Sequence, residues 1–213
     1  MTATRYPIPA ATCRCEIEVK KSRFIATIEP TNTPEAALGF ISRIKQEFPD
    51  ATHNCWAYLI GPPGSSDRIG LSDDGEPHGV AGKPMLTTIQ HGGIGDITVV
   101  VTRYFGGTKL GKGGMVKAYT QAVKTALEQL DTAEKINWIK LSVKINYRLL
   151  ESIERLLPEF EVLLLDKQFT EQICLTLKLP EENLIILQTR LTDLSSGQIE
   201  FSKAEKLSPC SGD

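Results

Sequence analysis

Apolar and polar positions along the first part of the chain alternate in segments of strand length and helix length. Residues 15–29 have an extended pattern around a polar run, and residues 55–60 form a short apolar strand. Thr33 and Pro34 are typical of a helix start, and apolar residues at helical spacing follow them. Residues 97–104 carry apolar side chains on both faces, which predicts a strand buried on both faces.

Two polar segments that contain glycine flank this predicted central strand. Residues 69–83 are rich in Asp, Gly and Pro and predict a loop, after which residues 84–90 fit a short helix. After the strand, the glycine run of residues 106–114 leads into a long helical pattern. Functional residues are common in such loops, so we expect the functional centre within residues 72–119.

A second compact pattern follows a boundary at residues 131–135. Its predicted elements are, in chain order, a strand at 139–145, a helix at 147–157, strands at 162–165 and 173–179, a helix at 181–194 and a strand at 199–201. This βαββαβ order is typical of the ferredoxin-like sandwich. The sequence therefore predicts an α+β protein of two domains, residues 1–131 and 136–206.

Composition narrows the class of protein. With 41% apolar and 23% charged residues the chain has an ordinary globular composition, and its formal charge of −2 argues against binding DNA through bulk electrostatics. No apolar run approaches the roughly 18 residues of a membrane span, and the N-terminus lacks an apolar signal core. We expect a soluble, cytoplasmic protein with no membrane partner.

The five cysteines are odd in number and scattered, which fits a reducing compartment better than a disulfide framework. Cys13 and Cys15 share one strand face, and the alternative is a metal site built from them with His53 and Cys55. Their spacing lacks both a CxxC knuckle and a second pair of zinc ligands. We predict no metal and no cofactor.

The glycine run resembles the opening of a phosphate-binding P-loop. Gly106, Gly111 and Lys112 match the spacing G-x-x-x-x-G-K, and the motif lies between a predicted strand and a predicted helix. Gly113 replaces the hydroxyl residue that holds magnesium, and no second strand ends in an acid suited to a Walker B role. The run favours an anion-binding helix start without hydrolysis, with a tight turn for close helix packing as the alternative.

Three carboxylates share the preceding loop. Asp73, Asp74 and Glu76 either hold Mg²⁺, orient a basic partner or form a solvated loop. The histidines have no paired metal-binding spacing, and no G-x-S-x-G nucleophile elbow is present. Cys55 lies in a predicted core strand, which disfavours a catalytic pair with His53. We assign no catalytic residue.

Cations and aromatic residues surround the glycine run. They are Arg103, Lys109, Lys112, Lys117, Tyr104 and Tyr119. This mixture suits a phosphate backbone with stacked bases, and it acts locally, which a net charge near zero permits. The predicted second domain lacks the RNP1 pattern and carries Leu, Ile and Val on its strands, so we do not expect it to bind RNA by base stacking.

Five stretches together resemble the YigZ/IMPACT family over nearly the whole chain. They are KSRFI at 21–25, ATHNC at 51–55, SDDGEP at 72–77, AGKPM at 81–85 and VVTRYFGGTKLGKGGMVKAY at 100–119. The last stretch is the most specific of the five. Lys112 and His78 depart from the family pattern, which has small residues at both positions.

The resemblance implies a fold and a broad role. The family's first domain is similar to the βαβ fold of a small-subunit ribosomal protein and of domain IV of translocating elongation factors. Its second domain is similar to the last domain of those factors. Eukaryotic relatives are similar in the first domain only and are implicated in regulating translation initiation through a stress-responsive kinase pathway. The resemblance therefore implies a translation-associated binding protein, and our own expectation is that it is not catalytic.

The candidate ligand-binding residues match the family or surround the glycine run. They are His53, Asp73, Asp74, Glu76, Lys83, Arg103, Tyr104, Gly106, Gly107, Lys109, Gly111, Gly113, Gly114, Lys117 and Tyr119. The first hypothesis is a module that binds RNA or a ribosome-linked partner. The second is an enzyme or binding protein for a phosphorylated small molecule, with His53 as acid or base and Asp73 or Asp74 holding a metal. The third is a scaffold for a translation-factor protein partner.

Overall fold

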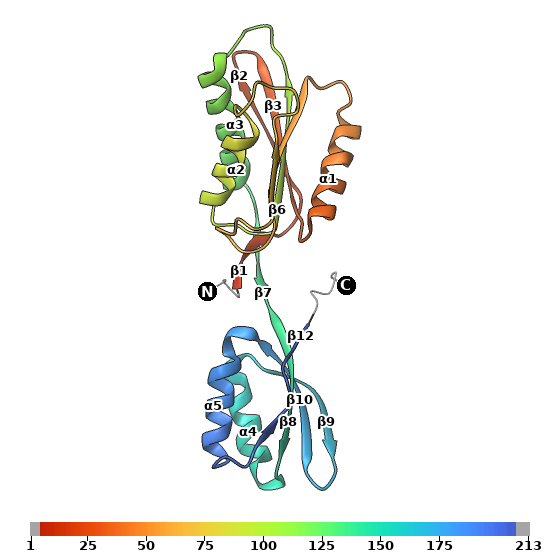
Figure 1. The fold of residues 1–213 in the computed structure, drawn as a ribbon, viewed down its shortest axis with the longest axis vertical. Helices are drawn as coiled ribbons and strands as arrows, with labels where there is room; N and C mark the ends of the chain where they lie inside the picture. Colours follow the sequence, from red (N-terminus) through yellow and green to blue (C-terminus); the bar gives the residue numbers. More distant parts are fainter. Residues whose placement is uncertain (1–4, 208–213) are drawn as a thin grey trace. The chain divides into compact units, whose positions relative to one another are not determined.

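The computed structural model describes residues 5–207, and the chain divides into two compact units between Lys135 and Ile136 (Figure 1). Each unit has its own hydrophobic core. Cys210 lies outside the described residues.

The first unit is built on a five-stranded antiparallel sheet with the order β2-β3-β6-β4-β5. Its strands are β2 (Cys13–Val19), β3 (Ser22–Pro30), β4 (His53–Leu59), β5 (Ile69–Ser72) and β6 (Ile97–Tyr104). Its helices are α1 (Pro34–Glu47), α2 (Gly82–His91) and α3 (Gly111–Glu128). Figure 1 shows α1 on one face of the sheet and α2 with α3 on the other.

The two covered faces explain the apolar pattern of the central strand. Val99 and Val101 on β6 are buried in the core beneath α2 and α3. Val100, which points to the opposite face, packs with Phe40, Ile41 and Ile44 of α1 in a smaller core. The prediction of a strand buried on both faces at residues 97–104 is therefore confirmed.

Residues 15–29, predicted as one extended segment, form a hairpin instead. Val19 pairs with Ser22, which leaves Lys20 and Lys21 as a two-residue turn. Both lysines have positive φ angles, 48° and 66°. Such turns usually carry Asn-Gly or similar pairs, so two lysines gave no turn signal in the sequence.

Other boundaries also differ from the pattern. The segment predicted as loop contains β5, and α2 begins at Gly82 rather than residue 84. The long helix α3 begins inside the glycine run, at Gly111. Two further strands that were not predicted, β1 (Arg5–Pro9) and β7 (Thr132–Ile136), pair with each other.

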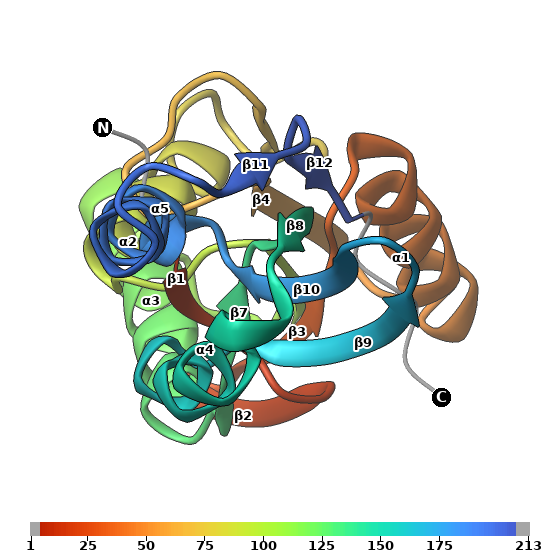
Figure 2. The same cartoon turned by 90° about the horizontal axis from the view of Figure 1, so that it is seen from below.

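The second unit has the predicted ferredoxin-like topology. Its sheet has the order β11-β8-β10-β9, and a short strand, β12, also pairs with β8. The strands are β8 (Trp138–Ile145), β9 (Leu163–Phe169), β10 (Ile173–Pro180), β11 (Glu200–Phe201) and β12 (Glu205–Lys206). The helices α4 (Leu150–Leu156) and α5 (Leu184–Leu194) cover one face of this sheet in both views (Figures 1 and 2).

Alternation along two strands builds the core of this unit. Leu141 and Val143 of β8 and Leu175 and Leu177 of β10 are fully buried between the sheet and the two helices. The helix predicted at residues 147–157 is shorter and has a 3₁₀ turn at each end. No helix within residues 5–207 has the length and apolar character needed to cross a membrane.

Candidate functional site

A buried ion pair lies where the acidic loop meets β6 and α3. Glu76 and Arg103 have only 3% and 7% of their side chains exposed, and Arg103 Nη1 donates to Glu76 Oε1. The Tyr119 hydroxyl donates to the same carboxylate oxygen at 2.9 Å. Met115 Sδ lies 3.7 Å from Arg103 Nη1. A buried carboxylate requires such partners, because without them its desolvation is very unfavourable.

The Arg103 side chain is only partly satisfied by these contacts. Its guanidinium carbon lies 5.4 Å from the ring centroid of Phe24 and 5.7 Å from that of Phe105, within cation–π range. Its Nε is buried and has no hydrogen-bond partner among residues 5–207. A buried N–H group without a partner is unusual in a folded protein and calls for an explanation.

His53 is held at the edge of this cluster. Its Nδ1 lies 2.8 Å from the Asp74 carbonyl oxygen, and its Nε2 lies 3.9 Å from Glu76 Oε2. Because a carbonyl oxygen only accepts, the His53 Nδ1 carries a proton. A Cβ atom at Gly75 would lie 3.3 Å from the His53 ring, so glycine gives the ring its room.

Asp73 caps the start of α2 through hydrogen bonds to its backbone N–H groups. Its carboxylate accepts backbone N–H groups from Gly79, Ala81 and Gly82 at 2.7, 3.0 and 2.9 Å. The helix has no other side-chain cap, because its N-cap residue is Ala81. Partial burial opposes ionisation of Asp73, but the three N–H groups outweigh it and lower its pKa.

Asp74 also accepts hydrogen bonds, from two donors. Its carboxylate accepts from the Asn54 backbone N–H at 2.7 Å and from Lys45 Nζ at 2.5 Å. Burial again opposes ionisation, and the bonds from Lys45 and Asn54 outweigh it and lower the pKa of Asp74. Nowhere in residues 5–207 do three His, Cys, Asp or Glu side chains gather to hold a metal ion. His53 thus lies beside the acidic loop, as the enzyme hypothesis requires, but both aspartates serve as structural acceptors.

Cys55 lies beneath this cluster and is not available as a nucleophile. Its Sγ is 3.3 Å from the Tyr119 hydroxyl and 2.9 Å from the Asp73 carbonyl oxygen. Burial raises the pKa of the Cys55 thiol to about 12 and raises the pKa of Tyr119 as well. Only the thiolate reacts readily, so a thiol of this kind is inert at neutral pH.

A pocket of about 380 Å³ opens above the ion pair, between the acidic loop and the glycine run. It is lined by five of the predicted residues, which are His53, Glu76, Arg103, Lys109 and Gly111. Lys112 joins Lys109 on its lining, and apolar walls come from Phe105, Leu110 and Met115. Of the predicted acids and cations, Glu76, Arg103 and Lys109 therefore share one concave site.

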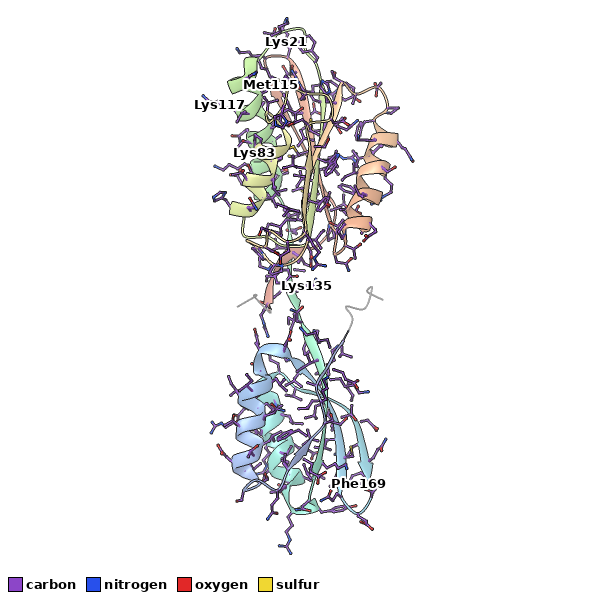
Figure 3. All side chains as sticks on the ribbon, in the orientation of Figure 1. Lys21, Lys83, Met115, Lys117, Lys135 and Phe169 are labelled. Carbon is purple, nitrogen blue, oxygen red and sulfur yellow. The ribbon has the colours of Figure 1, made fainter. Side chains whose placement is uncertain are left out.

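Other predicted residues lie elsewhere. Tyr104 does not line this pocket, because neighbouring residues of a strand point to opposite faces. Its hydroxyl donates to Asp50 at 2.9 Å, and the Arg23 guanidinium lies over its ring at 5.4 Å. Lys83 lines a separate groove between α2 and α3, and Lys117 is exposed on α3 (Figure 3).

The glycines of the run differ in what they do. A Cβ at Gly106 would lie 1.9 Å from the Lys21 carbonyl oxygen, so this glycine lets the β2–β3 turn lie against the run. Gly107 and Gly111 have positive φ angles of 82° and 70°. Gly113 has nothing near its Cβ position, whereas at Gly114 that position is 3.2 Å from the Leu110 Cβ.

Several residues that the site uses were not among the candidates from the sequence. Phe105 and Met115 wall the pocket, and Asn54 holds Asp74 through its backbone. Met115 and Tyr119 are four residues apart on α3, so helical spacing was a signal that placed Met115 on the inner face. No local sequence signal identified the backbone N–H of Asn54 as a donor to Asp74.

Both halves of the chain match models of known protein families. A family model described as the Impact N-terminal domain matches residues 20–127, which include the whole pocket. A second model, described as a domain of unknown function (DUF1949), matches residues 143–198. The chain belongs to the IMPACT family. Both halves of this IMPACT family member are therefore similar to domains that known families share.

Full-length relatives support the same assignment. The IMPACT family member YigZ of Escherichia coli (strain K12) is 40% identical over 199 residues, 93% of this chain and 98% of the relative. The IMPACT family member YvyE of Bacillus subtilis (strain 168) is 36% identical over 191 residues, 89% and 87% of the two chains. A solved structure titled "Crystal structure of an hypothetical protein" covers 97% of this chain and 99% of its own, with 38% identity and a TM-score of 0.65.

Proposed function

We propose that this IMPACT family member is a non-catalytic protein of translation that binds single-stranded RNA, alone or within a ribosomal partner. The binding face is the cationic end of the first unit, defined here as Lys20, Lys21, Lys109, Lys112 and Lys117. These lysines come from the β2–β3 turn, the glycine run and the first turns of α3. Such a face acts locally, so it needs no basic net charge.

The distribution of unpaired lysines carries the proposal. Among the described residues of the first unit, Lys45, Lys124 and Lys135 each form an ion pair with an acid. The lysines without an ion pair there are Lys20, Lys21, Lys83, Lys109, Lys112 and Lys117. Except for Lys83, they are the residues of the cationic end. Unpaired ammonium groups concentrated on one surface are what a phosphate backbone requires.

Two contacts join these segments into one surface. The Gly106 N–H donates to Ser22 Oγ at 3.1 Å, and Gly106 leaves room for the Lys21 carbonyl oxygen. The turn therefore lies directly against the glycine run, and Figure 3 shows Lys21 at this end of the unit. Lys20 and Lys21 hold backbone conformations that favour glycine or asparagine, and strain of this kind often marks a functional position.

An exposed aromatic ring lies within the same surface. Phe105, between β6 and the glycine run, has 48% of its surface exposed, and the Arg103 guanidinium packs against its ring. Single-stranded RNA is commonly bound by cations that follow the backbone and by aromatic rings that stack bases. Phe105 has the position and the exposure for the second task.

Salt-dependent binding tests this function. We expect a single-stranded RNA with a 5′-hydroxyl end to bind the full chain, with an affinity that falls steeply with salt. Lys21→Gln/Lys117→Gln is expected to reduce the slope of log K against log salt by about 1.4, because each lost phosphate contact removes roughly 0.7. Arg148→Gln/Lys203→Gln removes two exposed cations of the second unit and serves as the matched control.

The results distinguish the alternatives. No RNA binding at low salt, or equal effects of both double variants, would contradict a binding face at the cationic end. A protein partner captured from cell extract that survives ribonuclease treatment and does not require Lys21 or Lys117 would favour the scaffold hypothesis instead.

A further inference from the structure

A groove of about 730 Å³ lies between α2 and α3 on the outer side of the first unit. The two helices pack side by side on one face of the sheet (Figure 1), and Gly92, directly after α2, lies against Leu127 of α3. None of the residues that line this groove belongs to the pocket above the ion pair or to the cationic end. The RNA-binding function proposed above therefore leaves the groove without a role.

Apolar side chains from both helices lie open in this groove. Val116 and Leu127 of α3 and Pro84 of α2 line it and are only partly buried. Ile94, which follows α2, adds a further apolar group. The core of the first unit is complete beneath them, so the fold does not need these groups to be exposed. A concave surface with open apolar groups between charged side chains is typical of a binding site for a partner.

Positive charge exceeds negative charge around the groove. Lys83, His91 and Lys124 line it, whereas Glu128 is the one acid among its described lining residues. Lys83 has no ion pair within residues 5–207. Lys124 Nζ lies 3.9 Å from Glu128 Oε1, with 63% and 61% of the two side chains exposed, and an ion pair of this kind contributes little. One lysine on each helix is therefore available to an acidic partner.

The helical walls determine which form of partner fits. In a helix the backbone N–H and C=O groups bond to each other, so the walls offer an incoming chain no row of backbone partners as a strand edge would. A chain buried in the groove must satisfy its own backbone groups, and an α-helix does so. Between Lys83 and His91, α2 rises by about 12 Å, so roughly two turns of a partner helix lie along it.

We propose that the groove between α2 and α3 binds an acidic amphipathic helix of a partner protein. The apolar stripe of that helix lies against Val116 and Leu127, and acids on its two flanks face Lys83 and Lys124. A phosphate backbone fits less well, because it needs a continuous row of cations, and here apolar side chains separate the two lysines. Figure 3 shows Lys83 on the outer side of the first unit, where such a helix would lie.

Three synthetic peptides test this site on the full chain. The acidic peptide is a helix of about four turns with Leu at i, i+3, i+4 and i+7 and Glu at most other positions. The basic peptide has Lys in place of Glu, and the third peptide keeps the acidic composition in an order that forms no apolar stripe. We expect fluorescence anisotropy to show that the wild-type chain binds the acidic peptide at least about tenfold more tightly than either of the others.

Two kinds of variant test the charge and the shape of the groove. Lys83→Glu/Lys124→Glu changes two exposed side chains, and we expect it to weaken the acidic peptide about tenfold or more and to strengthen the basic one. Thr120→Trp fills the groove and is expected to weaken the acidic peptide without changing the charge. Arg148→Glu/Lys203→Glu changes the net charge equally in the second unit and should leave peptide binding within about twofold of the wild-type value.

The location of the peptide decides the result. A photoreactive group on the apolar stripe of the acidic peptide is expected to crosslink to residues 83–94 or 116–128. Absence of binding by the wild-type chain, equal effects of the two double variants, or crosslinks outside these segments would overturn the proposal. Self-association of the chain that Thr120→Trp abolishes, without peptide binding, would instead assign the groove to a second copy. Lys21→Gln/Lys117→Gln should leave peptide binding unchanged, so failure of the RNA function does not affect this test.

Discussion

Glu76 and Arg103 are 27 residues apart in the chain, yet they form a buried ion pair that is the floor of the candidate pocket. Glu76 comes from a loop and Arg103 from the central strand, so the pair fixes the acidic loop against the sheet. Tyr119 of α3 binds the same carboxylate and adds the third element. The pair therefore has a structural role whether or not a ligand binds.

Replacing one partner of the Glu76–Arg103 pair should lower the free energy of unfolding more than replacing both partners. Glu76→Gln leaves the Arg103 charge buried without a counter-charge, and we expect the free energy of unfolding to fall by about 3 kcal/mol. Glu76→Gln/Arg103→Met should recover a substantial part of that loss. Urea unfolding followed by Trp56 fluorescence in a Trp138→Phe background reports on the first unit alone. A double variant less stable than the single one would show that the pair itself is strongly stabilising.

Asp73 should stabilise the first unit in a pH-dependent way. Its pKa is lowered in the folded state, so its contribution is complete above the unfolded value of about 3.9 and is lost as the pH falls through the lower folded value. Asp73→Asn is expected to reduce the free energy of unfolding by about 1 kcal/mol at pH 7, as for a lost helix cap. The difference between wild type and variant should shrink below about pH 4. A constant difference across that range would contradict an ionised cap.

Replacing the strained turn should separate stability from binding. Lys20→Asn/Lys21→Gly introduces the pair that suits two positive φ angles. We therefore expect the midpoint of thermal unfolding to rise and the free energy of unfolding to increase by about 1 kcal/mol. The same change removes two cations from the cationic end and should weaken RNA binding, most at low salt. Arg148→Gln/Lys203→Gln again supplies the control. Unchanged RNA affinity would exclude the turn from the binding face.

Cys55 should be unreactive in the folded protein. With its pKa raised to about 12, almost none of the thiol is ionised at neutral pH, and its side chain is buried. We expect alkylation of Cys55 by iodoacetamide, followed by peptide mass spectrometry, to proceed only as fast as the first unit opens. Cys174, which is partly exposed, serves as the internal comparison. Rapid labelling of Cys55 in native buffer would contradict its burial.

Much of the fold was predictable because its signals are local. Alternation in β8 and β10 and the helical periods between them predict the ferredoxin-like order of the second unit, and the apolar run of β6 predicts a central strand. The β2–β3 turn was not predictable in this way. Its packing depends on Gly106, distant in sequence, which leaves room for the Lys21 carbonyl oxygen.

The sequence by itself determined which residues are unusual in this protein: the acids of residues 73–76, Arg103 and the glycines after β6. Only the tertiary structure decided what each of them does. Asp73 and Asp74 became structural acceptors because folding brings N–H donors from α2 and β4 to them. Glu76 and Arg103 became the floor of a pocket because a loop and a strand meet there. Residue type sets what a side chain is able to do, but its partners depend on contacts between segments far apart in the chain.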